Sequence, residues 1–359
     1  MDATRVDWSM GSQAALLADW DTAAEIGRRV AGPGVRVVAA DRARMREDFA
    51  EVVPRSEGLI RDFTGLDPGG FRSRPWVMGR SEWIRANLRG LQRMLEPLAG
   101  RILAKQPSGR GTLRRKALGA QAGALLGYVS RRVLGQYDAT LPPDDEGLLY
   151  FVGPNVAEVE RRFELVPRDF RLWVAIHEVT HRVQFGAASW LQGHIREQVD
   201  RYLGTISLDS KELGEQLRRA IDELRTGAQN RSIGALSFLL TPEQRAIVLH
   251  VQGVMSLLEG HASYVMNEVA REHVADLDPM RRALAERRRR AGSVERSFQR
   301  AIGFDKKIEQ YDAGERFVRG VVDRSGMAGL NRVWLAPEAL PTVEEIAEPD
   351  RWVARVAGS

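Results

Sequence analysis

The chain has 359 residues, of which 43% are hydrophobic and 28% are charged. This composition is ordinary for a folded globular protein and excludes a largely disordered chain. There is no cysteine, so disulfides and thiolate metal sites are excluded, and a transition metal would have to be bound by His, Asp or Glu. The net charge is +5, and lysine supplies only 5 of the 53 basic residues.

The start of the chain, residues 1–21, carries acidic residues where a secretory signal needs a basic region and an unbroken apolar run. Apolar stretches elsewhere are interrupted well before the roughly 20 residues that cross a bilayer. We therefore expect a cytoplasmic protein with no membrane contact.

Most of the sequence has the three-and-four spacing of apolar residues that is typical of helices. The pattern predicts helices over residues 12–30, 42–63, 81–105, 111–134 and 155–165. Two short apolar runs, 35–40 and 147–153, predict strands. The expected fold is mainly α with a small β component. The stretch "LPPDDEG" predicts a boundary between an N-terminal helical region, residues 1–140, and a second region, residues 141–359.

One predicted helix follows Pro167 and ends before Gly186, and it contains the sequence "HEVTH". His177 and His181 are four residues apart, so both imidazoles lie on one face and can meet one ion. Glu178 borders that face, where it could act as general base on a water that the metal activates. A helix with two hydrogen-bonded core histidines is the structural alternative.

A second long helix is predicted after Thr241, which begins a capping-box pattern with Pro242 and Gln244. An apolar stripe then continues from Val251 to Val269. This helix carries the candidates for a third ligand in the sequence "LLEGHASY".

Glu259 and His261 lie 160° apart on a regular helix, so only one of them can bind the same ion as the histidine pair. A carboxylate at the edge of an apolar face is costly unless it has a cation or metal as partner, which favours Glu259. A salt bridge to arginine is its structural alternative. His261 is expected in the core or supporting a ligand, and His261 and Tyr264 are candidates for stabilising an oxyanion. The remaining histidines 194, 250 and 273 have no partner at ligand spacing.

Two further features lie in the last third of the chain. The arginine-rich segment 281–300 suits the solvated face of a helix, and nucleic-acid binding is the lesser alternative because the segment has no recognised binding motif and a single aromatic residue, Phe298. Trp334 and Trp352 are expected to pin a C-terminal tail that wraps the metal-binding region, and Thr342 with Glu345 forms a second capping-box pattern.

The combination of "HEVTH" with "LEGHASY" about eighty residues later resembles the zinc metallopeptidases whose third ligand is a glutamate. More narrowly, the chain resembles zinc-dependent hydrolases of actinobacteria and chloroflexi that carry a label for deazaflavin coenzyme biosynthesis. Stretches such as "YFVGPNVAEVERRF" and "GMAGLNRVWLAPEALPT" extend the resemblance over most of the chain.

The resemblance implies a mostly helical, zincin-like α+β fold, with Zn²⁺ bound by His177, His181 and Glu259 and with Glu178 as base. The expected function is a zinc-dependent hydrolase, most simply a peptidase acting on a peptide or protein. The alternative is a binding or assembly protein that keeps a structural zinc. A structural site has no need of a carboxylate beside its first ligand, so Glu178 distinguishes the two.

Overall fold

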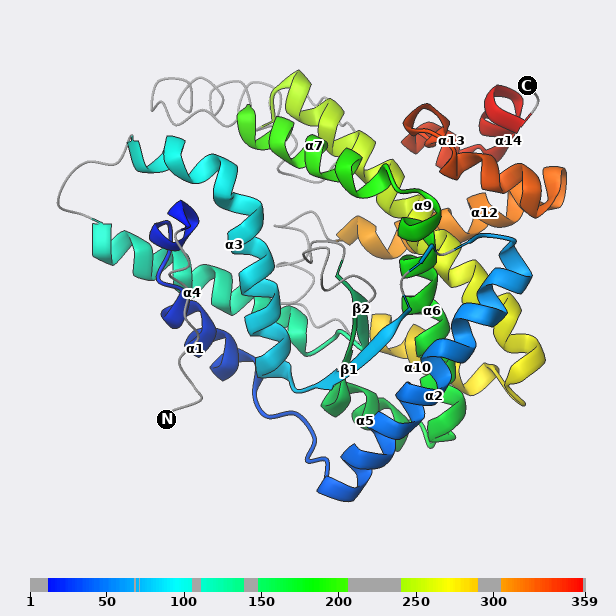
Figure 1. Cartoon of the computed structure of the whole chain (residues 1–359), viewed down its shortest axis with the longest axis horizontal. Coiled ribbons are helices and arrows are strands. Elements are labelled where there is room, and N and C mark those ends of the chain that lie inside the picture. Colours follow the sequence, from blue (N-terminus) through cyan, green and yellow to red (C-terminus); the bar gives the residue numbers. More distant parts are fainter. Residues whose placement is uncertain are drawn as a thin grey trace. The chain divides into compact units, whose positions relative to one another are not determined.

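The structure is a computed structural model and describes residues 12–67, 69–70, 72–104, 111–138, 148–205, 240–289 and 305–357. These residues are mostly helical and include one three-stranded sheet, which confirms the expected mainly α fold (Figure 1). None of the described helices is both long and apolar enough to cross a membrane.

The chain divides into two compact units. The first comprises residues 1–54 and 72–175, and the second comprises residues 55–71 and 176–359. Two of the three borders fall inside helices, α2 (Ala39–Thr64) and α6 (Pro167–Ala187), and the third precedes residue 72. The boundary expected at residues 141–147 lies outside the described residues and stays a prediction.

The sheet belongs to the first unit, and its strand order is β1-β3-β2. The central strand β3 (Leu148–Val152) is parallel to β1 (Arg74–Met78) and antiparallel to β2 (Gly135–Tyr137). Its sequence "LLYFV" is apolar throughout, as expected of a central strand that is buried on both faces. The strand predicted at 147–153 is therefore confirmed.

The strand predicted at 35–40 is wrong. Residues 35–38 form no strand, and α2 begins at Ala39. Three valines in four residues, interrupted by Arg36, do not distinguish a strand from an irregular segment, and the helix-forming sequence "AADRAR" follows at once.

Helices α1 (Trp20–Ala31), α3 (Arg80–Ala104), α4 (Gly111–Ser130) and α5 (Gly153–Arg162) complete the first unit. The single helix expected over 12–30 is instead a short 3₁₀ turn, η1 (Gln13–Leu16), followed by α1, because the Asp19 side chain accepts from Thr22 N–H and starts a new helix. Helix α4 packs closely on α1 through glycine: a Cβ at Gly123 would lie 2.2 Å from the Ala23 carbonyl oxygen.

The second unit is built around α9 (Pro242–His273). Its start has the predicted capping box, in which the Thr241 side chain accepts from Gln244 N–H and the Gln244 side chain accepts from Thr241 N–H. Val254 and the residues of the expected apolar stripe from Leu258 to Val269 are buried, whereas Val251 and Met255 are half-buried. Helices α7 (Leu191–Gly204), α10 (Asp278–Arg289) and α12 (Asp305–Asn331) belong to the same unit.

Helix α12 crosses α9 at very short range. A Cβ at Gly260 would lie 2.1 Å from the Gly314 carbonyl carbon, and a Cβ at Gly314 would lie 2.0 Å from the Ser256 carbonyl oxygen. The two backbones can touch only because both crossing positions are glycine.

The C-terminal tail consists of the short helices α13 (Val343–Ala347) and α14 (Pro349–Trp352) and the turns beside them. The predicted tryptophan anchors are confirmed: Trp334 and Trp352 are both buried, and Trp352 Nε1 donates to the Ala339 carbonyl. The capping box of Thr342 and Glu345 is confirmed as well.

Candidate metal centre

Helix α6 presents the "HEVTH" residues. Asp169 in its first turn suits the positive end of the helix dipole, and the helix continues through the predicted face to Ala187. The imidazole rings of His177 and His181 are 4.9 Å apart and nearly perpendicular, at 82°. Both side chains are mostly buried but keep some exposure, 19% and 14%, so the pair is reachable from solvent.

Helix α9 brings Glu259 to this pair. Its Oε2 lies 3.8 Å from His177 Nε2 and 3.7 Å from His181 Nε2. One ligand atom from each of the three residues lies within 4.8 Å of the others. Two ligands at about 2.0–2.1 Å from a tetrahedral zinc are roughly 3.3 Å apart, so small side-chain adjustments would bring all three to one ion. The three side chains that the sequence proposed as ligands thus meet at one place.

The carboxylates beside His181 change its proton affinity. Burial by itself would lower the pKa of His181, but the hydrogen bond and charge of Glu259, with smaller contributions from Glu178 and Gln184, raise that pKa from 6.5 to about 9. The site is therefore a negative environment that stabilises positive charge at the imidazole. The same negative potential would stabilise a bound divalent cation.

Glu178 borders the cluster as expected. Its Oε1 lies 3.5 Å from His177 Nδ1, and its side chain is 10% exposed. The carboxylate thus lies beside the ring nitrogen of His177 that does not face Glu259.

The structure adds one residue of α6, Gln184, to the surroundings of the cluster. Gln184 has no exposed surface. Its amide contacts His181 Nδ1 at 3.0 Å, the Leu258 carbonyl at 2.9 Å and His261 Nδ1 at 2.9 Å. Only its position three residues after His181 could have drawn attention to it.

His261 lies in the core, with no exposed surface. Its ring packs edge-on against Trp334, with centroids 5.2 Å apart, and Gln184 occupies its Nδ1. Burial, and next the neighbouring His181, lower the pKa of His261 to about 3, so the ring is neutral. This geometry suits a supporting role better than metal ligation.

Tyr264 is also buried, and its surroundings differ from those of the ligand cluster. Its ring lies 6.2 Å from that of Phe63, with the Arg319 guanidinium 5.1 Å from the ring centre. Burial, followed by the charge of Glu268, raises the pKa of Tyr264. An oxyanion role for Tyr264 stays a prediction.

Two histidines without a partner at ligand spacing in the sequence are partners in space. His194 of α7 and His250 of α9 approach to 2.7 Å between their Nε2 atoms, although 56 residues separate them. Burial, then His194 and Arg201, lower the pKa of His250. A pairing between helices that are distant in sequence leaves no local signature.

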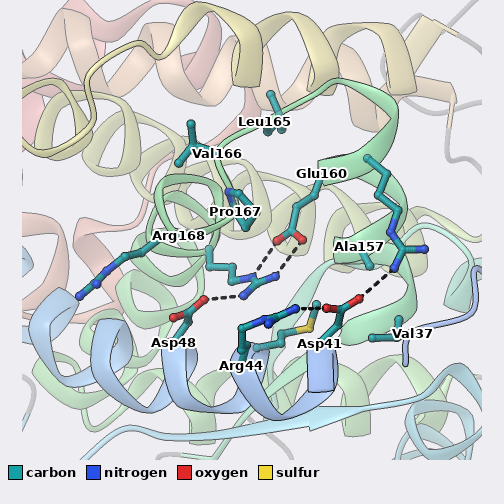
Figure 2. Close-up of a pocket in the computed structure, with 13 residues that line it drawn as sticks. Val37, Asp41, Arg44, Asp48, Ala157, Glu160, Leu165, Val166, Pro167 and Arg168 are labelled. Atoms are coloured by element: carbon teal, nitrogen blue, oxygen red, sulfur yellow. Dashed lines mark hydrogen bonds and ion pairs between the residues drawn. The ribbon is translucent and has the colours of Figure 1, made fainter. Parts of the chain in front are cut away.

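A hollow of about 510 Å³ lies in the first unit, and none of the three clustered side chains lines it (Figure 2). Most of its charged lining residues pair among themselves, and Arg168 pairs with Glu51 instead. The Arg171 guanidinium donates to both oxygens of Glu160, at 2.8 and 2.9 Å, and to Asp48, while Asp41 pairs with Arg161 at 3.4 Å. Because these charges neutralise one another, we interpret the hollow as the surface of a structural ion-pair network.

The arginine-rich segment cannot be compared in full with its prediction. Residues 290–300 lie outside the described part of the chain, and α10 covers only the beginning of the segment. Both alternatives for it stay predictions.

Comparison with known proteins agrees with the site. The family model for zincin-like metallopeptidases matches residues 18–353. A solved structure from Chloroflexus aurantiacus, of a candidate hydrolase with a novel fold, is 34% identical over 96% of this chain and 100% of that chain, with a TM-score of 0.70. No curated protein matches the sequence, and neither match concerns deazaflavin. The chain belongs to the zincin-like metallopeptidase family.

Proposed function

We propose that this protein is a zinc-dependent hydrolase that cleaves peptide bonds, with Glu178 as general base. The observation that carries the proposal is the convergence of His177, His181 and Glu259 from two helices, with their ligand atoms within 4.8 Å of one another. Membership of the metallopeptidase family supports the same reaction class.

The donor set fits zinc. Two imidazoles and one carboxylate, with a fourth position left for water, are a known arrangement of catalytic zinc sites, whereas structural sites are usually closed by four protein ligands. Among the described residues, this is the only group of three or more potential ligands that comes together. The partial exposure of all three side chains also suits a site that must admit a substrate.

Bound zinc would supply Lewis acidity, polarising the scissile carbonyl and making water a better nucleophile at neutral pH. The protein's own contribution is proton transfer. Glu178 accepts a proton from the attacking water and returns it to the departing amine, so the carboxylate ends the cycle in its starting form. His261 is fully buried, so in this proposal it supports α9 and does not touch the substrate.

Replacing Glu178 tests the base directly. Glu178→Gln keeps the shape and removes the proton acceptor, so bound zinc should remain stoichiometric while turnover of a fluorescence-quenched peptide library falls by about 10²–10⁴. Zinc is measured by elemental analysis of protein purified without added metal. If turnover is unchanged in the zinc-loaded variant, Glu178 is not the base.

The ligand assignment has its own test and an internal control. His177→Ala, His181→Ala and Glu259→Ala should each weaken zinc binding strongly, while His261→Ala should weaken it much less. Equal losses at positions 259 and 261 would contradict the choice of Glu259.

Zinc-loaded wild type that cleaves no member of the library would contradict the peptidase proposal. It would favour a binding or assembly protein with a retained zinc site.

A further inference from the structure

Gln184 joins the two helices that carry the proposed ligands. It lies on α6, three residues after His181, and its amide reaches across to Leu258 and His261 on α9. The residue has no exposed surface. A buried amide has two donor hydrogens and one acceptor oxygen to satisfy, and here all three find partners within the protein.

The orientation of this amide follows from its partners. The Leu258 carbonyl can only accept, so the Gln184 NH₂ group must face it, at 2.9 Å. The same amide nitrogen lies 2.9 Å from His261 Nδ1 and directs its second hydrogen there, so Nδ1 must be the unprotonated nitrogen of that ring. This leaves the Gln184 oxygen facing His181 Nδ1 at 3.0 Å.

The oxygen then determines which nitrogen of His181 is available to a metal. Since a carbonyl oxygen only accepts, His181 Nδ1 must carry a hydrogen and donate it. The lone pair of the imidazole is then restricted to Nε2, which is the atom 3.7 Å from Glu259 Oε2. Metal-bound histidines commonly make such a hydrogen bond through their second nitrogen, and it fixes both ring orientation and tautomer.

The same amide also acts on the third ligand. Leu258, whose carbonyl accepts from Gln184, immediately precedes Glu259 in α9. One side chain therefore fixes the His181 ring on α6 and tethers the turn of α9 from which Glu259 projects.

We propose that Gln184 is a positioning residue for zinc: it selects the Nε2 tautomer of His181 and holds the Glu259 segment of α9 in register with α6. The inference rests on the proposed function, because it concerns the same metal site. His261 completes the arrangement as the acceptor for the second amide hydrogen.

Gln184→Met tests the proposal, because methionine has a similar length and neither donates nor accepts in this way. We expect the zinc dissociation constant, measured by competition with a chromophoric chelator, to rise about 10–100-fold. Gln244→Met is the matched control, because it removes another buried glutamine, which lies in the capping box of α9. Gln244 precedes Glu259 by fifteen residues, about four helical turns. The control should bind zinc within about twofold of wild type, since its partners are Thr241 and Thr205 and not a ligand.

A second variant separates positioning from general packing. Gln184→Glu keeps an acceptor for His181 Nδ1 but loses both donations to α9. In nitrogen-resolved NMR of the zinc-loaded proteins, the His181 Nδ1–H signal should stay slow to exchange in wild type and in Gln184→Glu. It should be lost in Gln184→Met.

The outcomes are separable. Wild type that binds no zinc overturns the proposed function itself. Wild type and Gln184→Met with equal zinc affinity overturn only the role of Gln184. If Gln184→Met does not fold, Gln184→Glu decides: retention of the protected Nδ1–H supports the assignment, and its loss overturns it.

Discussion

Substituting alanine for Gly260 would test the close crossing of α9 and α12. The new methyl group would meet the Gly314 carbonyl carbon at 2.1 Å and the Glu315 amide nitrogen at 2.6 Å. Both contacts are with backbone, so no side-chain rotation can relieve them. Ordinary van der Waals contact requires 3.4 Å or more, and the helices would have to separate by roughly 1 Å.

The expected cost follows from two opposing terms. Overpacking a tight interior typically costs about 1–3 kcal/mol, and a clash between backbones belongs at the upper end. Alanine regains about 1 kcal/mol over glycine through its helix propensity. We expect Gly260→Ala to lower the free energy of unfolding by about 2 kcal/mol, measured by urea denaturation with tryptophan fluorescence.

Gly58 provides a control of opposite sign. It also lies inside a helix, α2, but a Cβ there would meet no atom within 4 Å. Gly58→Ala should therefore stabilise the protein by up to about 1 kcal/mol. A Gly260→Ala variant as stable as wild type, or as stable as Gly58→Ala, would refute the argument from the helix crossing.

Three further predictions concern metal, ion pairs and pH. Zinc at a hundred times its dissociation constant should raise the free energy of unfolding by about 2.7 kcal/mol. A chelator should reverse this gain. A melting temperature that does not change when zinc is added would contradict a zinc site that forms only on folding. Arg171→Met should destabilise the first unit by about 3–5 kcal/mol, because Glu160 would remain buried without its bidentate partner. Urea denaturation measures this loss. Unchanged stability would contradict the prediction and would mean that Glu160 becomes protonated at little cost. The pKa of His250 is lowered by burial, by His194 and by Arg201, so its contribution to stability is complete above the unfolded pKa of about 6.5 and is lost as the pH falls toward the folded value. His250→Gln should therefore lose less free energy of unfolding than wild type between pH 7 and about pH 5. Equal pH dependence of the free energy of unfolding in the two proteins would refute this prediction.

The cluster of His177, His181 and Glu259 could be predicted because its sequence signals are local. The two histidines occupy one helix face by their spacing, and the cost of an unpaired carboxylate at an apolar edge singled out Glu259 from its neighbour His261. The starts of α6 and α9 were predictable for the same reason, since capping residues act within one turn. The expected end of α6 before Gly186 is wrong by two residues, because the helix continues to Ala187.

Interactions across helices could not be predicted in this way. Gln184 looks like any inward-facing polar residue until α9 supplies the Leu258 carbonyl beside it. The contact between His194 and His250 likewise depends on how two helices pack. The false strand at 35–40 shows the other limit: a short apolar run fits several local structures, and only the identity of its neighbours in space decides among them.

Because α9 is a single uninterrupted helix, an insertion or deletion within it would displace the side chains that follow. Inserting or deleting one residue between Thr241 and Glu259 would rotate the carboxylate by about 100° around the axis and shift it by about 1.5 Å, while the glycine crossing at 260 would lose its match on α12. Length variation among natural relatives should therefore accumulate outside this helix, and a designer who wishes to graft new loops should leave its residue count untouched.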